Sequence, residues 1–63
     1  MPISYFFNRQ VIHYVNDGSY NIPSIGDEIT IDSRIFTVES KILKPYEEGK
    51  RQYFIDLKPK ENV

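Results

Sequence analysis

The sequence predicts an all-β protein, folded as a small antiparallel barrel that is partly open and has four to five strands. β-branched and aromatic residues dominate the apolar set, with five Tyr and four Phe, and alanine is absent. This composition favours strand over helix. Apolar and polar residues also alternate with a period of two in short runs bounded by turn-forming residues. Four or five such short strands curl most economically into a small, partly open barrel.

Length and charge limit the classes of protein that fit. The 63 residues allow a single domain, residues 1–63, and contain no cysteine for a disulfide or a thiolate metal site. Eight basic and nine acidic residues are mixed along the chain, which gives no electrostatic footprint for nucleic acid or an anionic membrane. No signal peptide and no stretch of roughly 20 apolar residues occurs. We therefore expect a cytoplasmic protein without a cofactor, whose core depends on packing or self-association.

The N-terminal run, residues 3–15, reads as one bent strand or as two short strands. A turn at Asn8-Arg9 or at Arg9-Gln10 would separate the two pieces. Alternation places three side chains on one face of the first piece: Ile3, Tyr5 and Phe7. Both faces of the second piece are partly apolar, so its inner side stays open. A loop follows over residues 16–24, where Asp17-Gly18 favours a turn.

Residues 28–38 predict a hairpin with a two-residue loop at Ser33-Arg34, or with a slightly longer loop, because Ser-Arg is not a preferred dipeptide for a primed turn. The alternating run "EITID" points Ile29 and Ile31 to one side. The predicted loop sets four cross-strand pairs: Ile31–Phe36, Ile29–Val38, Thr30–Thr37 and the unfavourable Glu28–Glu39.

Residues 39–45 and 51–58 predict a second hairpin, whose turn is centred on Glu48-Gly49. One register aligns five pairs: Ile42–Ile55 and Ser40–Leu57 inside, and Glu39–Lys58, Lys41–Asp56 and Leu43–Phe54 outside. The predicted core is apolar: Ile22, Ile25, Ile29, Ile31, Phe36, Val38, Ile42, Ile55 and Leu57. We expect the charged residues 58–63 to form a frayed tail.

No residues in the sequence have the spacing of a catalytic or metal site. His13 is the only histidine, and without a cysteine or a placed acid it reads as a structural or surface residue. Asp27 and Glu28 are adjacent, so on a strand their carboxylates point to opposite faces and cannot act as an acid–base pair. Gly26-Asp27 is better explained by a turn. We predict that the protein is not an enzyme.

Single-stranded nucleic-acid binding is the alternative function, because small barrels bind strands through aromatic and basic side chains. Basic residues gather after residue 40, interleaved with tyrosine and phenylalanine. Acids are also frequent there, and the predicted register pairs two of the lysines with carboxylates. Little free positive charge remains, so we do not expect nucleic acid as the partner.

The apolar residues exceed what one inner face can hold. The predicted register leaves Leu43 and Phe54 outside, and Phe6, Ile12 and Tyr14 cannot all lie inside. A monomer of this size seldom leaves such a patch uncovered, and exposed sheet edges favour pairing. These features predict an interface with another protein or with a second copy, as a homodimer.

A pattern of turn and strand residues extends over residues 22–59. It consists of Pro23, Gly26, Asp27, Ile29, Ile31, Phe36, Val38 and Leu57. With this pattern the chain resembles small uncharacterised proteins of phages and prophages, and Src-homology-type small barrels of unrelated functions share it. The resemblance implies an origin in a mobile element and supplies no catalytic residues. Phage proteins of this size that act on host systems are usually stoichiometric binders.

We therefore predict a non-enzymatic protein–protein interaction module. The resemblance adds the hypothesis of a phage-encoded stoichiometric inhibitor of a host defence or regulatory protein, acting in the host cytoplasm. The predicted partner-binding residues lie at the second hairpin: Leu43, Tyr46, Glu47, Glu48, Lys50, Arg51 and Phe54. Loops on rigid sheets are common recognition elements.

Overall fold

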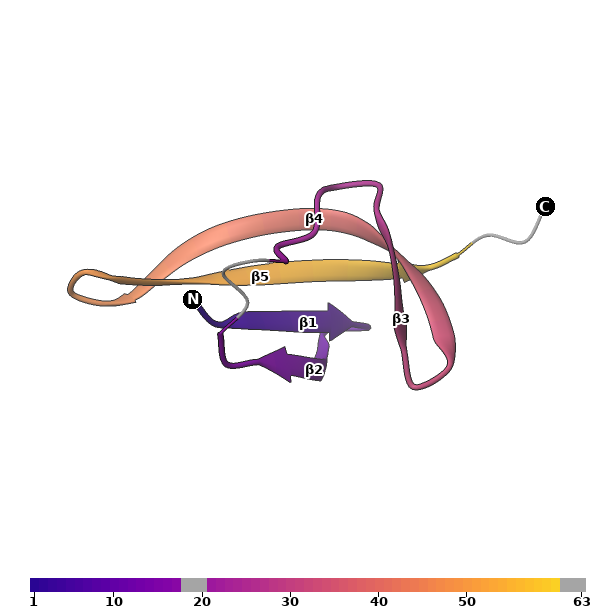
Figure 1. Ribbon diagram of the computed structural model, residues 1–63, viewed down its shortest axis with the longest axis horizontal. Coiled ribbons are helices and arrows are strands. Elements are labelled where there is room, and N and C mark those ends of the chain that lie inside the picture. The colour runs from indigo at the N-terminus through magenta and orange to yellow at the C-terminus, as the bar shows by residue number, and fades with distance from the viewer. Residues whose placement is uncertain (18–20, 61–63) are drawn as a thin grey trace.

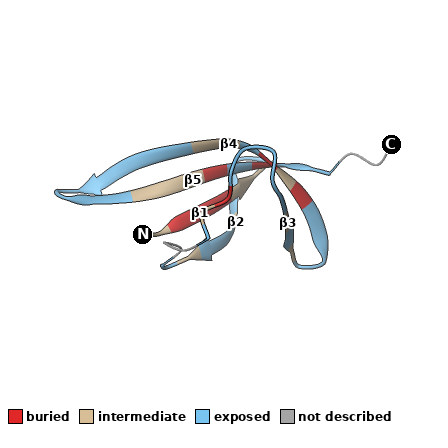
Figure 2. Ribbon diagram, turned by 45° about the horizontal axis from the view of Figure 1, so that its top comes forward, coloured by how far each residue is buried: buried red, intermediate tan, exposed pale blue. Residues whose placement is uncertain are grey.

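The computed structural model describes residues 1–17 and 21–60, which form one sheet of five strands and no helix (Figure 1). The strands are β1 (Ile3–Phe7), β2 (Gln10–Val15), β3 (Glu28–Ile31), β4 (Arg34–Glu47) and β5 (Lys50–Pro59). Their order in the sheet is β2-β1-β5-β4-β3. The sheet is open and strongly curled, which confirms the predicted all-β, partly open barrel (Figure 2). Among the described strand pairs, β1 and β5 run parallel and the others antiparallel.

The N-terminal run forms two strands with a tight turn at Asn8-Arg9. Both turn residues have positive φ, 51° and 64°, as the primed turns of two-residue hairpins require. The ladder pairs Tyr5 with His13 and Phe6 with Val11, so Ile12 is an extra residue in β2. This bulge turns Ile12 towards the core.

The β3–β4 hairpin confirms the predicted faces but corrects the predicted loop. The turn residues are Asp32 and Ser33, with φ of 50° and 67°, instead of Ser33-Arg34. Because the loop starts one residue earlier, each β3 residue meets a β4 residue two positions earlier than predicted. The observed pairs are Glu28–Thr37, Ile29–Phe36, Thr30–Ile35 and Ile31–Arg34. A shift of two keeps every side chain on its predicted face and removes the Glu28–Glu39 clash.

The predicted β4–β5 register is wrong, although its turn at Glu48-Gly49 is confirmed, with φ of 75° at the glycine. The observed ladder pairs Val38 with Leu57 and then Ser40 with Asp56, so Glu39 is an extra residue. Past such a bulge the alternation of β4 reverses. The observed pairs beyond it are Lys41–Ile55, Ile42–Phe54, Leu43–Tyr53, Lys44–Gln52 and Pro45–Arg51. The predicted Glu39–Lys58 and Lys41–Asp56 charge pairs are therefore not ladder neighbours.

The core lies inside the curl and comes from β1, β4 and β5 (Figure 2). Its buried apolar residues are Ile3, Tyr5, Phe36, Val38, Ile55 and Leu57. The predicted core residues Ile22, Ile29 and Ile31 are partly buried and pack against this cluster. Two predicted core residues are wrong: Ile25 is 66% exposed and Ile42 is 44% exposed. Ile42 lies outside because the Glu39 bulge moves it to the other face.

The C-terminal end of β5 is held in the sheet. The predicted frayed tail is wrong for its first residues, since β5 extends to Pro59. The Lys60 amide donates to the carbonyl of Ile35 at 3.1 Å, and the Lys60 ammonium lies 2.9 Å from the Glu28 carboxylate. Gly18 of the predicted Asp17-Gly18 turn and residues 61–63 lie outside the described residues. The described residues contain no helix long and apolar enough to cross a membrane.

Candidate interaction surfaces

The outer part of the β4–β5 hairpin extends beyond the rest of the sheet, and we call residues 43–52 the hairpin arm. β1 pairs with β5 only from Tyr53 onward, and the Tyr53 amide donates to the carbonyl of Pro2 at 2.9 Å. β3 pairs with β4 only up to Thr37. The arm is therefore a two-stranded ribbon that projects from one end of the molecule (Figure 1).

The arm gathers most of the predicted partner-binding residues. Leu43 and Tyr46 are 41% and 44% exposed. The tip carries both signs of charge, from Glu47, Glu48, Lys50 and Arg51, all exposed. One contact orders it, because the Lys50 ammonium lies 3.3 Å from the Glu47 carboxylate. Exposed apolar and charged side chains therefore stand together on a ribbon without a third strand.

The predicted placement of Leu43 beside Phe54 is wrong. Leu43 pairs with Tyr53, whereas Phe54 pairs with Ile42. Directly paired residues share a face and consecutive residues alternate, so Leu43 and Phe54 lie on opposite faces of the ribbon. Leu43 belongs to the arm, and Phe54 belongs to a second apolar surface on the outside of the curl.

This second surface, the convex patch, consists of Phe6, Val11, Tyr14, Ile42 and Phe54. The Phe6 and Phe54 rings meet edge to face, with centroids 5.1 Å apart. Ile42 pairs with Phe54 on one side, and Val11 pairs with Phe6 on the other. The Ile12 bulge places Val11 and Tyr14 on this same face, opposite Phe6 and Ser4. The patch thus crosses the neighbouring strands β2, β1, β5 and β4.

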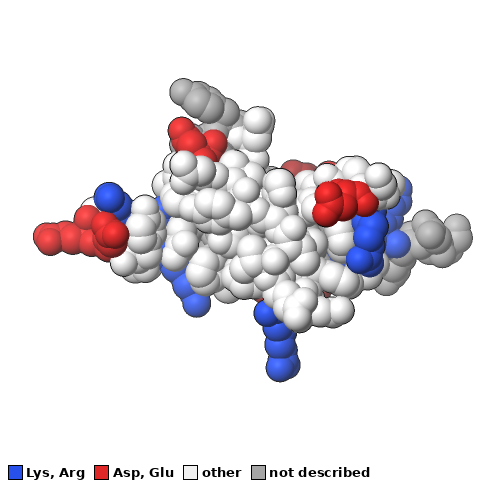
Figure 3. Space-filling view, turned by 90° about the horizontal axis from the view of Figure 1, so that it is seen from below, with Lys and Arg blue, Asp and Glu red and all other residues white. Residues whose placement is uncertain are grey.

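The β2 end of the convex patch continues into uncharged surface. β2 has the sequence QVIHYV, without a charged residue. Seen from the β2 side, a broad uncharged area occupies the middle of the molecule, and charged side chains gather mainly towards its ends and rim (Figure 3).

Sequence reasoning finds only part of the convex patch. It places Phe6, Tyr14 and Phe54 among the apolar residues that one inner face cannot hold, which agrees with their position. It misses Val11 and Ile42, because each faces outward owing to a bulge. Bulges have no reliable signature in a single sequence, so no signal at these positions could have found them.

One charged residue lies on each side of the Ile42–Phe54 pair. Lys44 is two residues from Ile42, and its ammonium lies 5.1 Å from the centroid of the Phe54 ring. Asp56 is two residues from Phe54 in the other direction, and its carboxylate accepts a hydrogen bond from the Ser40 hydroxyl at 2.9 Å. The convex patch therefore has a positive end and a negative end.

The chemistry-bearing residues outside these surfaces have structural roles. The Asp27 carboxylate accepts a hydrogen bond from the Ser24 amide at 2.9 Å, and Gly26 has a φ of 94°, which confirms the predicted turn. His13 packs its ring against Tyr5, with centroids 5.5 Å apart. Among residues 1–17 and 21–60, no three His, Cys, Asp or Glu side chains are grouped to hold a metal ion.

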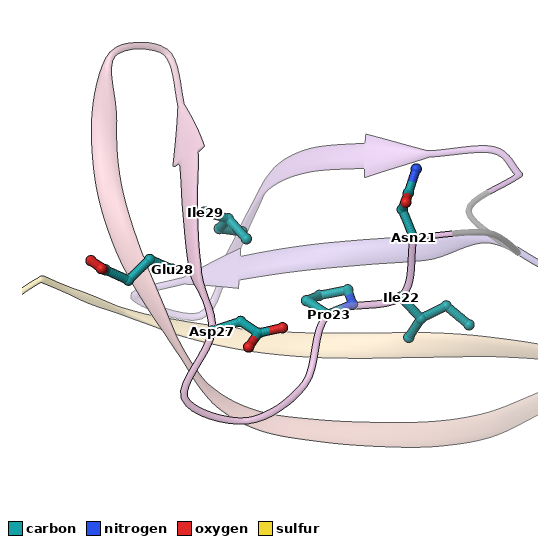
Figure 4. A pocket seen from close by; sticks show the side chains of 6 residues that line it. All are labelled: Asn21, Ile22, Pro23, Asp27, Glu28 and Ile29. Atoms are coloured by element: carbon teal, nitrogen blue, oxygen red, sulfur yellow. The ribbon is translucent and has the colours of Figure 1, made fainter.

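An open pocket of about 470 Å³ lies beside the loop before β3 (Figure 4). It is lined by Asn21, Ile22, Pro23, Asp27, Glu28 and Ile29. The carboxylates of Asp27 and Glu28 point apart, as strand alternation predicts (Figure 4). One is held by the turn and the other by Lys60. The pocket therefore presents no pair of carboxylates that can share one substrate.

Comparison of the chain with protein-family models, curated proteins and solved structures gives no match.

Proposed function

We propose that this protein is a non-enzymatic protein-binding module whose hairpin arm contacts the partner. One observation carries the proposal: the arm extends past both neighbouring strands while exposing Leu43 and Tyr46. An isolated two-stranded hairpin is marginally stable in water. A two-stranded ribbon that lacks a third strand and exposes apolar side chains is stabilised when another molecule covers those side chains.

The composition of the arm supports a protein as that partner. Tyr and Arg, present here as Tyr46 and Arg51, are enriched among the residues that contribute most to protein interfaces. The acidic and basic residues of the tip are mixed, which suits a polar rim around an apolar contact better than the uniform charge of a phosphate-binding surface.

The resemblance to phage and prophage proteins extends this proposal. We propose a host defence or regulatory protein as the partner, bound stoichiometrically. A projecting two-stranded ribbon can occupy a groove or cover a functional surface on such a protein without any chemistry of its own.

Affinity capture with matched variants tests the proposal. The double variant Leu43→Ser/Tyr46→Ser removes the apolar contacts of the arm, and Ile25→Ser is the control, because Ile25 is exposed but lies in the loop before β3. We expect host proteins retained by the native chain to be retained by the control and lost by the arm variant. Equal retention by all three proteins would exclude the arm as the binding element.

Single-stranded nucleic-acid binding is the second candidate function, and two contacts favour it. The Lys41 ammonium lies 5.2 Å from the centroid of the Tyr53 ring, and Lys44 lies over Phe54 in the same way. Lys41 pairs with Ile55 and not with Asp56, the carboxylate that the sequence-based register had placed opposite it. Titration with a labelled oligonucleotide at low salt decides the matter: binding that weakens steeply as salt rises would favour this function over the first.

A further inference from the structure

The convex patch is a sheet face that the arm does not use. Val11, Tyr14 and Ile42 are each exposed, although they adjoin the Phe6–Phe54 ring pair. Contiguous apolar surface across four strands of so small a sheet marks an interaction site. The charges at its two ends indicate what covers it.

The order of residues along the ladder places a positive charge at one end of the convex patch and a negative charge at the other. Successive outward pairs are Lys44–Gln52, Ile42–Phe54 and Ser40–Asp56. Lys44 and Asp56 therefore lie at opposite ends of the apolar centre, about 13 Å apart along the strands at 3.3 Å per residue. No ion pair joins the two side chains within the chain, since the Lys44 ammonium lies over the Phe54 ring and the Asp56 carboxylate accepts from Ser40.

This pattern complements itself under a two-fold rotation. Consider two copies packed face to face, with the two-fold axis lying between the faces and running across the strands. The rotation reverses the strand direction, so the Lys44 end of one copy lies over the Asp56 end of the other. Both ion pairs form at once, and the two apolar centres meet. Sheets packed in this way form an aligned sandwich, and such a self-complementary contact is the usual interface of a homodimer.

We propose that a second copy of this chain covers the convex patch, in a two-fold dimer where Lys44 of each copy pairs with Asp56 of the other. A nucleic-acid strand fits this face less well, because Asp56 would repel phosphate at one end of the patch. The proposal goes beyond the partner-binding role of the arm and does not depend on it.

Sedimentation velocity of the full chain, from about 1 µM to about 500 µM, tests the dimer. We expect the native chain to pass from monomer to dimer as its concentration rises. Ile42→Glu places a charge in the apolar centre and should weaken the dimer more than tenfold. Circular dichroism of each variant confirms that it is folded.

Charge reversal tests the arrangement of the two copies. Lys44→Glu places two carboxylates together at both ends of the interface, and Asp56→Lys places two ammonium groups together. We expect each single variant to weaken the dimer about tenfold and the double variant Lys44→Glu/Asp56→Lys to restore it to within about threefold of the native affinity. Restoration reports a contact between copies, because the two residues do not meet within one chain.

Arg51→Glu is the matched control, because it reverses a charge on the same ribbon but on the face opposite Phe54. We expect it to leave the dimer unchanged and to weaken partner capture by the arm, so the two proposals can fail separately. A native chain that stays monomeric throughout would overturn the dimer, and so would a double variant as weak as the single ones. A monomer that binds an oligonucleotide through Ile42 and Phe54 would assign the patch to nucleic acid instead.

Discussion

β4 and β5 together build regions of opposite character, the buried core on one side and the exposed arm and convex patch on the other. Ile55 of β5 is 0% exposed and Ile42 of β4 is 44% exposed. These two isoleucines are one ladder position apart, since Ile55 pairs with Lys41. Their different burial follows from the Glu39 bulge, which reverses the alternation of β4, and from β1, which supports only the inner part of β5. Neighbouring strands and bulges, more than residue type, therefore decide what is core in this protein.

The largest expected effect separates these two isoleucines. Ile55→Ala leaves a cavity at the centre of the core and should lower the free energy of unfolding by about 2–5 kcal/mol. Ile42→Ala removes exposed apolar area and should cost less than about 1 kcal/mol. Urea denaturation at a concentration where the chain is monomeric measures both. Equal costs would mean that Ile42 is buried and that the bulge at Glu39 is absent.

Two glycines with positive φ, one next to the core and one in the arm, should give changes in stability of intermediate size. An added Cβ meets nothing within 4 Å at Gly26 or Gly49, so alanine at either position acts through backbone strain of about 1–2 kcal/mol. Gly26 donates its amide to Val38 of the core at 2.9 Å, so Gly26→Ala should reduce global stability. Gly49 lies at the arm tip, so we expect Gly49→Ala to act mainly on local opening of the arm.

Hydrogen exchange distinguishes local from global effects. We expect Gly49→Ala to speed exchange of the arm amides while those around Ile55 keep their protection. Gly26→Ala should speed exchange throughout. If Gly49→Ala lowers protection of the core as much as Gly26→Ala does, the arm and the core unfold as one unit.

The stability of the core should also depend on pH. Burial raises the pKa of Tyr5 above its ordinary value of 10.0, because the charged phenolate is poorly solvated there. A group whose pKa is raised by folding stabilises the fold fully below its unfolded pKa, and this stabilisation is lost as pH rises through the folded pKa. Stability should therefore fall above about pH 10. Tyr5→Phe should flatten this part of the stability profile, and urea denaturation between about pH 8 and about pH 11 measures the difference.

The smallest expected effect concerns the ion pair at the end of the sheet opposite the arm. Lys60 and Glu28 are 2.9 Å apart, but their side chains are 45% and 49% exposed. Such a pair contributes about 0.5 kcal/mol or less. Lys60→Met should therefore change the urea midpoint only slightly, and less still in high salt. A loss above about 1 kcal/mol would show that the end of β5 is anchored through this pair.

Local features of the fold are predictable from the sequence, and features set by distant contacts are not. The turn at Glu48-Gly49 and the inward positions of Phe36 and Val38 follow from residue type and alternation, whereas the first turn stays open between Asn8-Arg9 and Arg9-Gln10. The bulges at Ile12 and Glu39 reverse that alternation without a sequence signal, which is why Ile42 is assigned wrongly. The parallel β1–β5 pairing depends on which strand, distant in sequence, forms the more stable contact with β1. The alternation of apolar and polar residues does not show which strand that is.

The two candidate surfaces also differ in how far local sequence predicts them. The residues of the arm tip are adjacent in sequence, so a hairpin turn is enough to bring them together. The convex patch needs four strands in their correct order and two bulges before its members meet. A surplus of apolar residues indicates that such a patch exists, but only the sheet order shows that Val11 and Ile42 complete it.

The parallel pairing of the first strand with the last has a consequence for how the protein is made. Ile3 pairs with Tyr53, so the core cannot close until β5 has left the ribosome. Pairing across so long a sequence separation is slow, whereas the β3–β4 and β4–β5 hairpins need only near neighbours. We therefore expect β3, β4 and β5 to assemble first and the N-terminal hairpin to join them last.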